Sequence, residues 1–178
     1  MAKNRYIKDY RIVETVNERG RIRSDYEYIG QPYYFVAKAE TISRVKKTLA
    51  ALCVLAWIAW ICAMLPDNTA MRTWYVSFPF AFAAIPLFLM ADLALPLLRL
   101  RQPMAHRTAD KLENRWPPRC LAAAILSGLA LLGEAVNLMR GLPMKGGDGI
   151  FTLCALLVLL CSALCFRERK TLACRKGN

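Results

Sequence analysis

Two acidic residues inside long apolar segments, Asp92 and Glu134, are the first candidates for chemistry in this chain. Ionisable side chains are rare within membranes, and those present commonly serve a proton or ion pathway. Each carboxylate is roughly 9 Å from one end of its segment, and the two ends lie on opposite sides. The pair is therefore too far apart for joint catalysis. In the structural interpretation, each pairs with a nearby arginine, Asp92 with Arg99 or Arg101 and Glu134 with Arg140.

Asn137 and Pro86 are the other candidate functional residues within the apolar segments. Asn137 is the obvious polar companion of Glu134, and a pathway joining Glu134 to Asp92 would need further polar groups. Pro86 lies in the middle of its segment and lacks a backbone N–H, so we expect it to kink a helix there. A structural kink is the simpler interpretation, and a gate is the alternative.

The cysteines and the single histidine do not predict a metal or catalytic site. Cys154, Cys161 and Cys165 share one helical stripe, but no histidine or carboxylate accompanies them. We interpret the stripe as small side chains packing a helix interface. His106 lies beside Arg107 without a surrounding motif, which favours a solvated loop residue over a base. We predict no catalytic residue, no metal and no cofactor, and hence a protein that is not an enzyme.

Four apolar segments must position these residues. Hydrophobic residues make up 56% of the 178-residue chain and are concentrated into long blocks. A helix crosses a hydrocarbon core of about 30 Å with ~20 residues, and each block reaches or approaches that length. The sequence therefore predicts an all-α integral membrane protein with one four-helix transmembrane domain, residues 48–166, whose spans are 48–65, 74–98, 120–139 and 150–166.

The basic residues are distributed very unequally between the connections. Lys and Arg number 22 in segments 1–47, 99–119 and 167–178 together, against three in the two remaining connections. By the positive-inside rule, both termini and the central loop are expected in the cytoplasm, with the protein in the plasma (cytoplasmic) membrane. The same charge attracts a lipid bilayer with anionic headgroups, and it does not indicate a nucleic-acid partner.

The N-terminal region, residues 1–34, has the pattern of a small cytoplasmic β-hairpin. Strands are expected at about 10–16 and 21–29, with Asn17–Gly20 as the turn. Ile22, Tyr26 and Tyr28 fall on one face of the second strand and are the candidate partner-facing residues. A two-stranded hairpin is marginally stable alone, so it needs a surface to lie on.

Shorter elements are expected around the spans. Residues 35–47 have helical periodicity and predict a juxtamembrane amphipathic helix, and residues 167–178 form a basic cytoplasmic tail. Residues 108–115 predict a brief helix stopped by Pro117 and Pro118. The glycine-rich segment 145–149 is interpreted as a flexible turn.

Small residues in the third span predict a close helix contact. Ala124 and Gly128, and likewise Ala123 and Ser127, have the spacing that lets two helices approach closely. Such pairs serve either packing within the bundle or a homo-oligomer interface, and the sequence does not separate the two.

These observations leave two functional hypotheses. The first is a non-enzymatic accessory or regulatory subunit that docks an unknown protein partner through its cytoplasmic segments. The second is a small oligomeric transporter or channel component that uses Asp92 and Glu134. The first is favoured because 80 residues are expected on one side of the membrane, without a catalytic motif within it.

Overall fold

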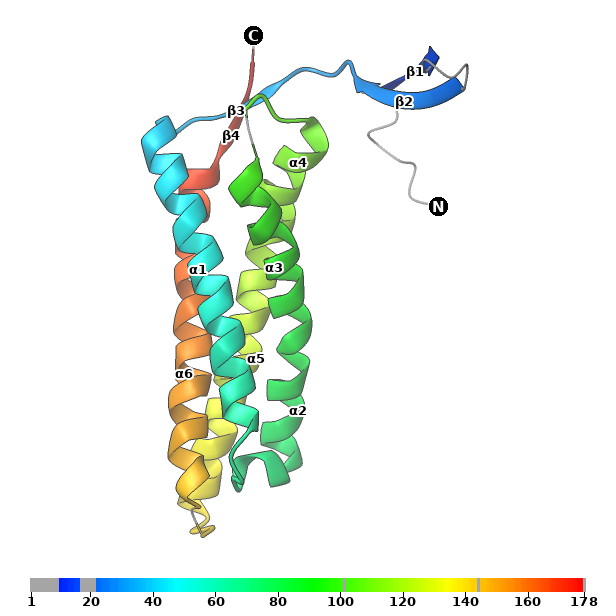
Figure 1. Ribbon diagram of the computed structural model, residues 1–178. Coiled ribbons are helices and arrows are strands. Elements are labelled where there is room, and N and C mark those ends of the chain that lie inside the picture. Colours follow the sequence, from blue (N-terminus) through cyan, green and yellow to red (C-terminus); the bar gives the residue numbers. More distant parts are fainter. Residues whose placement is uncertain (1–9, 17–21, 101, 144, 178) are drawn as a thin grey trace.

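Long helices dominate the computed structural model, which describes residues 10–16, 22–100, 102–143 and 145–177 (Figure 1). The prediction of a mostly helical chain with four candidate membrane spans is confirmed. Four helical runs are long and apolar enough to cross a membrane: Ala39–Met64, Trp74–Arg99, His106–Met139 and Gly146–Leu172.

The four runs form one bundle in which each packs against its neighbours in the chain, and the last packs against the first. Helix α1 (Ala39–Met64) contacts α6 (Gly146–Arg167) and α3 (Ala84–Arg99), while α5 (Trp116–Met139) contacts α6, α3 and α2 (Trp74–Phe82). The strands β3 (Tyr33–Phe35) and β4 (Cys174–Lys176), which precede α1 and follow α6, lie together at one end of the bundle (Figure 1). We call this the basic end, and the end that carries the connections α1–α2 and α5–α6 the loop end.

The outer surface of the bundle is apolar, as helices in contact with lipid require. Phe88 is 64% exposed, Leu132 65% and Leu153 68%, on three different helices. The interior combines small and large apolar side chains: Ala56 and Ala123 are almost fully buried there, and so are Phe80 and Trp116. The small side chains let the membrane helices approach one another closely.

Helices α1 and α6 begin earlier than the predicted spans. α1 runs unbroken from Ala39 through the first span, so the juxtamembrane helix predicted over 35–47 corresponds to its first turns, and Phe35 lies in a strand before it. α6 begins at Gly146, so the flexible turn predicted over 145–149 is wrong. Its first turn is closed by Asp148, whose Oδ2 accepts the Lys145 N–H at 2.7 Å.

Contrary to what the sequence led us to expect, the proline pair after the central connection does not stop the helix that precedes it. α4 (His106–Asp110) continues through a π-helical turn, Lys111–Arg115, directly into α5. Pro117 and Pro118 occupy the first turn of α5, where a missing N–H removes few helical hydrogen bonds. The wide turn before them accommodates the carbonyls that the prolines cannot bond.

Two small antiparallel sheets lie in the non-helical parts of the chain. β1 (Tyr10–Val16) pairs with β2 (Ile22–Tyr28), and the predicted turn Asn17–Gly20 lies outside the described residues. β3 (Tyr33–Phe35) pairs with β4 (Cys174–Lys176), which follows a short 3-10 helix, Glu168–Leu172. The predicted basic tail thus contains ordered structure that its sequence pattern does not indicate.

Candidate functional site

The two candidate carboxylates lie in different environments and are not brought together. Asp92 is exposed on the outer surface of α3, in the half of the bundle nearer the basic end. Glu134 is buried near the loop end, with 3% of its surface exposed. Among the described residues neither makes an ion pair, so Arg99 does not pair with Asp92 and Arg140 does not pair with Glu134. Arg101, the other partner predicted for Asp92, lies outside the described residues. The Arg140 guanidinium lies over the Tyr75 ring instead, 5.8 Å from its centroid.

A hydrogen-bonded network joins Glu134 to α2 through Asn137. The Asn137 Nδ2 donates to Glu134 Oε2 at 3.0 Å and to Thr73 Oγ1 at 3.1 Å. Its Oδ1 accepts the Tyr75 hydroxyl. Every polar atom of this buried amide therefore has a partner, as low-dielectric burial demands. Asn137 was correctly singled out as the companion of Glu134, but the sequence could not reveal Tyr75 and Thr73, which come from another helix.

A second network ties the two loop-end connections together around Asp148. The Asp148 carboxylate is almost fully buried and accepts the backbone N–H groups of Thr69 and Ala70, besides that of Lys145. Three such bonds satisfy a buried anion without a cation. Gly147 permits this contact, because a Cβ on it would lie 2.5 Å from the Asp67 carbonyl oxygen.

An exposed ion-pair group lies on the outside of the same connections. Asp67 accepts hydrogen bonds from Lys145 and from Arg72. The Lys145 hydrogen bond, with a smaller contribution from Arg72, holds the pKa of the Asp67 carboxyl below its ordinary value. Because these side chains face solvent, the group contributes far less to stability than Asp148 does.

The second span is interrupted where Pro86 leads us to expect a disturbance. α2 ends at Phe82 and α3 begins at Ala84. Phe82 lies four residues before Pro86, and a proline ring clashes with the carbonyl at that spacing. Trp60 of α1 reaches this break and donates its indole N–H to the Phe80 carbonyl at 2.9 Å. Its ring also stacks on Phe80. A carbonyl at the break is thus satisfied by the neighbouring helix.

At the basic end, three segments that are distant in sequence form one structured surface, which we call the cap. Its parts are β3, β4 and the start of the central connection. Tyr33 exchanges two backbone hydrogen bonds with Met104, both 3.0 Å long. The Tyr33 ring also stacks on His106 at 5.2 Å. His106 is therefore half-buried in the cap and is not the solvated loop residue expected from the sequence.

Further contacts attach the cap to the bundle. The Cys174 N–H of β4 donates to Glu113 Oε1 at 2.9 Å. The Lys46 ammonium of α1 donates to the Leu100 carbonyl at 2.7 Å. Below the cap, the fully buried Trp116 of α5 donates its indole N–H to the Cys165 carbonyl of α6 at 3.2 Å. The cap is consequently held to the first and third helical runs, and these runs are tied to the others beneath it.

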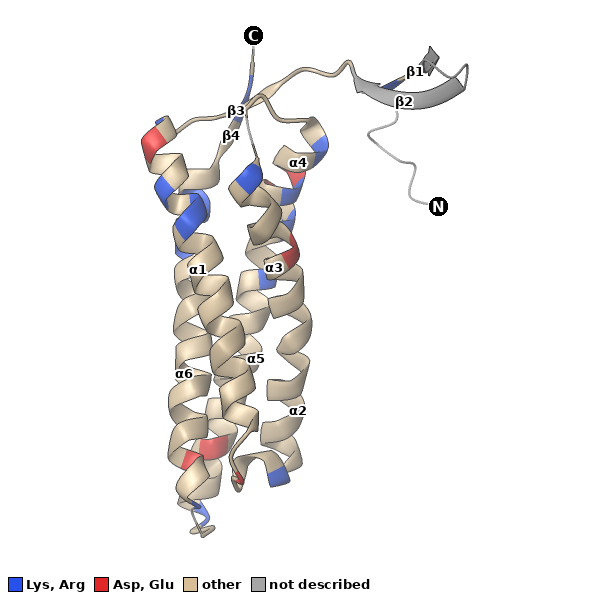
Figure 2. Cartoon of the chain, viewed as in Figure 1, with Lys and Arg blue, Asp and Glu red and all other residues tan. Residues whose placement is uncertain are grey.

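Most of the lysine and arginine residues of the bundle lie in its half nearer the cap, as Figure 2 shows. At the loop end the described basic residues are Arg72, Arg140 and Lys145. The segments rich in Lys and Arg and the segments poor in them therefore lie at opposite ends of the bundle. The side chains of Ile22, Tyr26 and Tyr28 lie outside the described part of β2, so their candidate role stays a prediction.

Buried cysteines come from three helices, among them Cys53 from α1, Cys120 from α5, and Cys161 and Cys165 from α6. These four belong to the same apolar core. The sequence showed the α6 stripe but could not show that Cys53 and Cys120 are buried in the same core. Among the described residues, no group of three or more His, Cys, Asp or Glu is arranged to hold a metal ion.

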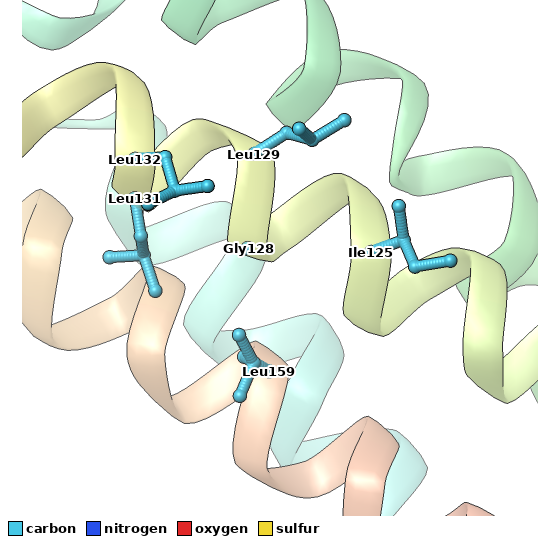
Figure 3. Close-up of a pocket in the computed structure, with 6 residues that line it drawn as sticks. All are labelled: Ile125, Gly128, Leu129, Leu131, Leu132 and Leu159. Atoms are coloured by element: carbon cyan, nitrogen blue, oxygen red, sulfur yellow. The ribbon is translucent and has the colours of Figure 1, made fainter.

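The small residues of α5 lie in two different environments. Ala123 and Ser127 are fully buried in the bundle, whereas Gly128 borders a shallow apolar groove between α5 and α6 (Figure 3). A Cβ on Gly128 would be 3.5 Å from the nearest atom of Leu159, an ordinary contact. The close approach occurs at Gly133, where a Cβ would lie 2.8 Å from Val76.

Comparison with known proteins adds no relationship to this description. No protein-family model, no curated protein and no solved structure matches the chain.

Proposed function

We propose that this chain is a non-enzymatic accessory or regulatory membrane protein that docks a partner protein through its basic end. The supporting observation is the cap, in which both terminal segments and the central connection are joined by the pairings β3–β4 and Tyr33–Met104. Crossing a bilayer does not require such a surface. A docking role explains why distant parts of the chain are held together outside the bundle.

The proposal includes an orientation, with the basic end in the cytoplasm of the cell that makes the protein. The charge distribution supports it through the positive-inside rule. Part of the basic charge then faces anionic headgroups, each residue contributing about 1 kcal/mol near the surface. The rest favours a partner with an acidic surface, because complementary charge speeds and orients docking.

The β1–β2 hairpin is the part of the chain that we assign to direct partner contact. Period-two alternation puts Ile22, Tyr26 and Tyr28 on one face of β2, and aromatic side chains are favoured at interfaces. Since a two-stranded hairpin is marginal in water, binding would stabilise it. Contact with a partner and folding of the hairpin are thus expected to occur together.

Deletion of residues 1–30 gives the sharpest test, because it removes the hairpin and leaves β3 paired with β4. Chemical crosslinking in native membranes, followed by purification and mass spectrometry, identifies the partner of the full-length chain. The deletion is expected to lose that partner while inserting normally. Retention of the same partner at the same level would exclude the hairpin as the docking element.

A matched pair of charge variants tests the role of the basic end. Arg175→Gln with Lys176→Gln removes two exposed charges from β4, and Arg72→Gln with Lys145→Gln removes two from the loop end. The first variant is expected to weaken partner recovery, more so at low than at high salt. The second should not affect it. Equal effects of the two variants would contradict docking at the basic end.

The alternative function, a small oligomeric transporter or channel component, is supported by the buried network of Glu134. Because Asp92 is on the outer surface, it would have to act at a contact between copies, with the helix break near Pro86 as the moving element. Reconstituted vesicles with Asp92→Asn or Glu134→Gln should then lose a proton or cation flux. Full flux in both variants would exclude this function.

A further inference from the structure

Asp92 is a short charged side chain on the outer face of the bundle, within a helical run that is expected to cross hydrocarbon. It is exposed on α3, and no ion pair among the described residues involves it. At roughly 1.5 Å per residue it lies about 27 Å from Trp74 and about 10 Å from Arg99, the two ends of its run. A hydrocarbon core of about 30 Å measured from Trp74 therefore includes it. Aspartate cannot extend to the water as lysine and arginine do, so a charge at this level calls for a partner.

Arg119 of α5 reaches nearly the same level as Asp92. Its guanidinium donates a hydrogen bond to the Leu89 carbonyl, which is one turn before Asp92 on α3. This bond lies at the surface, and the Arg119 side chain is only partly buried. A guanidinium has five N–H donors, so others remain for a second acceptor. The outer face thus presents a carboxylate and a guanidinium at similar depth, and the two do not form an ion pair within the chain.

Large apolar side chains continue this surface towards the loop end. Phe78, Phe82, Ile85 and Phe88 are each more than half exposed. Their spacing of three or four residues, which Asp92 continues, places them along one side of the second span. The rings of Phe78 and Phe82 stack with their centroids 6.3 Å apart. We call the surface formed by Phe78, Phe82, Ile85, Phe88 and Asp92, with Arg119 at its edge, the α3 face.

We propose that the α3 face binds a second copy of this chain, in a two-fold dimer in which Asp92 of each copy pairs with Arg119 of the other. Two copies inserted in the same direction are related by an axis along the membrane normal, so equivalent residues lie at equal depth. A carboxylate and a guanidinium at one level can then meet twice across that axis. In a medium of low dielectric constant such charge-assisted hydrogen bonds are strong.

Charge complementarity is the reason for choosing a second copy over an unrelated helix. A face that carried Asp92 alone would need a basic partner, whereas the α3 face supplies the opposite charge itself. The aromatic ridge adds apolar contact area along the same side of the span. The dimer does not depend on docking at the basic end, and it leaves the cap uncovered.

The test uses the full-length chain in lipid vesicles, with separate batches carrying a donor dye or an acceptor dye on a C-terminal tag. Energy transfer between copies is followed as the lipid-to-protein ratio is raised. The wild-type chain is expected to show transfer that falls on dilution as a monomer–dimer equilibrium requires. A wild-type chain that is monomeric at every ratio would overturn the proposal, and this is also the result expected if only lipid or an unrelated protein covers the face.

Charge reversal distinguishes pairing between copies from pairing within one copy. Asp92→Arg leaves two positive charges on the face and Arg119→Asp leaves two negative ones, so each variant is expected to weaken its own self-association about tenfold or more. A mixture of the two variants brings opposite charges together at both contacts and should recover near wild-type affinity. Pairing within one chain would give no such preference, so folded variants that fail to associate in the mixture would overturn the proposal.

Milder variants keep the test decisive if charge reversal prevents folding, which helicity shows. Asp92→Asn and Arg119→Gln are then expected to weaken the dimer, and wild-type affinity in both would overturn the pairing.

A matched pair of alanine variants locates the contact. Phe88 is 64% exposed on the α3 face, and Leu132 is 65% exposed beside the groove between α5 and α6. Phe88→Ala is expected to weaken the dimer, whereas Leu132→Ala is expected to leave it unchanged. A larger loss for Leu132→Ala would place the contact at the groove and overturn the assignment. Partner recovery with the deletion of residues 1–30 is a separate measurement, so failure of the dimer leaves the docking proposal standing.

Discussion

Gly147→Ala is expected to open the loop end of the bundle, because this glycine lets α6 touch the connection between α1 and α2. A Cβ there would lie 2.5 Å from the Asp67 carbonyl oxygen and 2.9 Å from the Pro66 Cβ, and both are parts of a short, constrained connection. An ordinary contact is at least 3.4 Å, so the Asp67 backbone must retreat by about 0.9 Å. The hydrogen bonds that Asp148 accepts from the same connection would then lengthen.

The magnitude follows from these opposing effects. Overpacking that displaces backbone costs about 1–3 kcal/mol. Weakening one charged hydrogen bond to Asp148 adds about 1–2 kcal/mol. Alanine is the better helix former, and this difference in helix propensity offsets up to about 1 kcal/mol of the loss. The net loss in the free energy of unfolding is therefore about 1–4 kcal/mol.

Gly149→Ala is the matched control, because it lies in the same turn of α6 and a Cβ there has nothing within 4 Å. It should stabilise the protein slightly, by up to about 1 kcal/mol. The free energy of unfolding is measured by SDS titration in mixed micelles, with helicity as the signal. If the two variants shift the transition equally, or if Gly147→Ala is neutral, the close packing of the connection on α6 is wrong.

Three further predictions concern other parts of the bundle. Gly133→Ala should lower the free energy of unfolding by about 1–3 kcal/mol, because a Cβ would lie 2.8 Å from Val76. Gly128→Ala should be neutral or slightly stabilising, and the same SDS titration compares the two variants. Trp60→Phe keeps the ring but leaves a carbonyl at the helix break without its donor, so it should cost about 1 kcal/mol, with a lower melting temperature in micelles as the readout. Burial, with a smaller effect of Glu113, raises the pKa of the Cys174 thiol to about 11. Its alkylation rate by iodoacetamide, followed by mass spectrometry, should therefore keep rising with pH beyond 9, and a plateau near pH 9 would contradict the buried cap.

The number and identity of the spans were predictable from the sequence because hydropathy reports how apolar a segment is. Hydropathy does not report which side chains meet across helices. The pairing of Glu134 was assigned to Arg140 on sequence proximity, whereas Asn137 lies one turn away and carries the contacts to α2. Asn137 was recognised only because it lies on the same helix as Glu134.

Glycines and prolines were misread for a related reason. Composition alone made residues 145–149 resemble a turn, yet Asp148 closes a helical turn there and Gly147 provides room for a neighbouring backbone. The proline pair was expected to end a helix, but the π-helical turn before it lets the helical run continue through the prolines into α5. Whether a glycine or proline ends a helix or lies inside one depends on the backbone on either side. A short sequence window carries little information about that backbone.

The pairing of β3 with β4 also has a consequence for biosynthesis. Tyr33 lies opposite Lys176, so the two strands are separated by nearly the whole length of the chain. Because the four helical runs lie between them, the second strand emerges from the ribosome long after the first. All four membrane helices have then been synthesised, and the segment around Tyr33 has remained unpaired throughout. This small sheet therefore closes only after the spans have been made, and a polypeptide terminated before Cys174 would never form it.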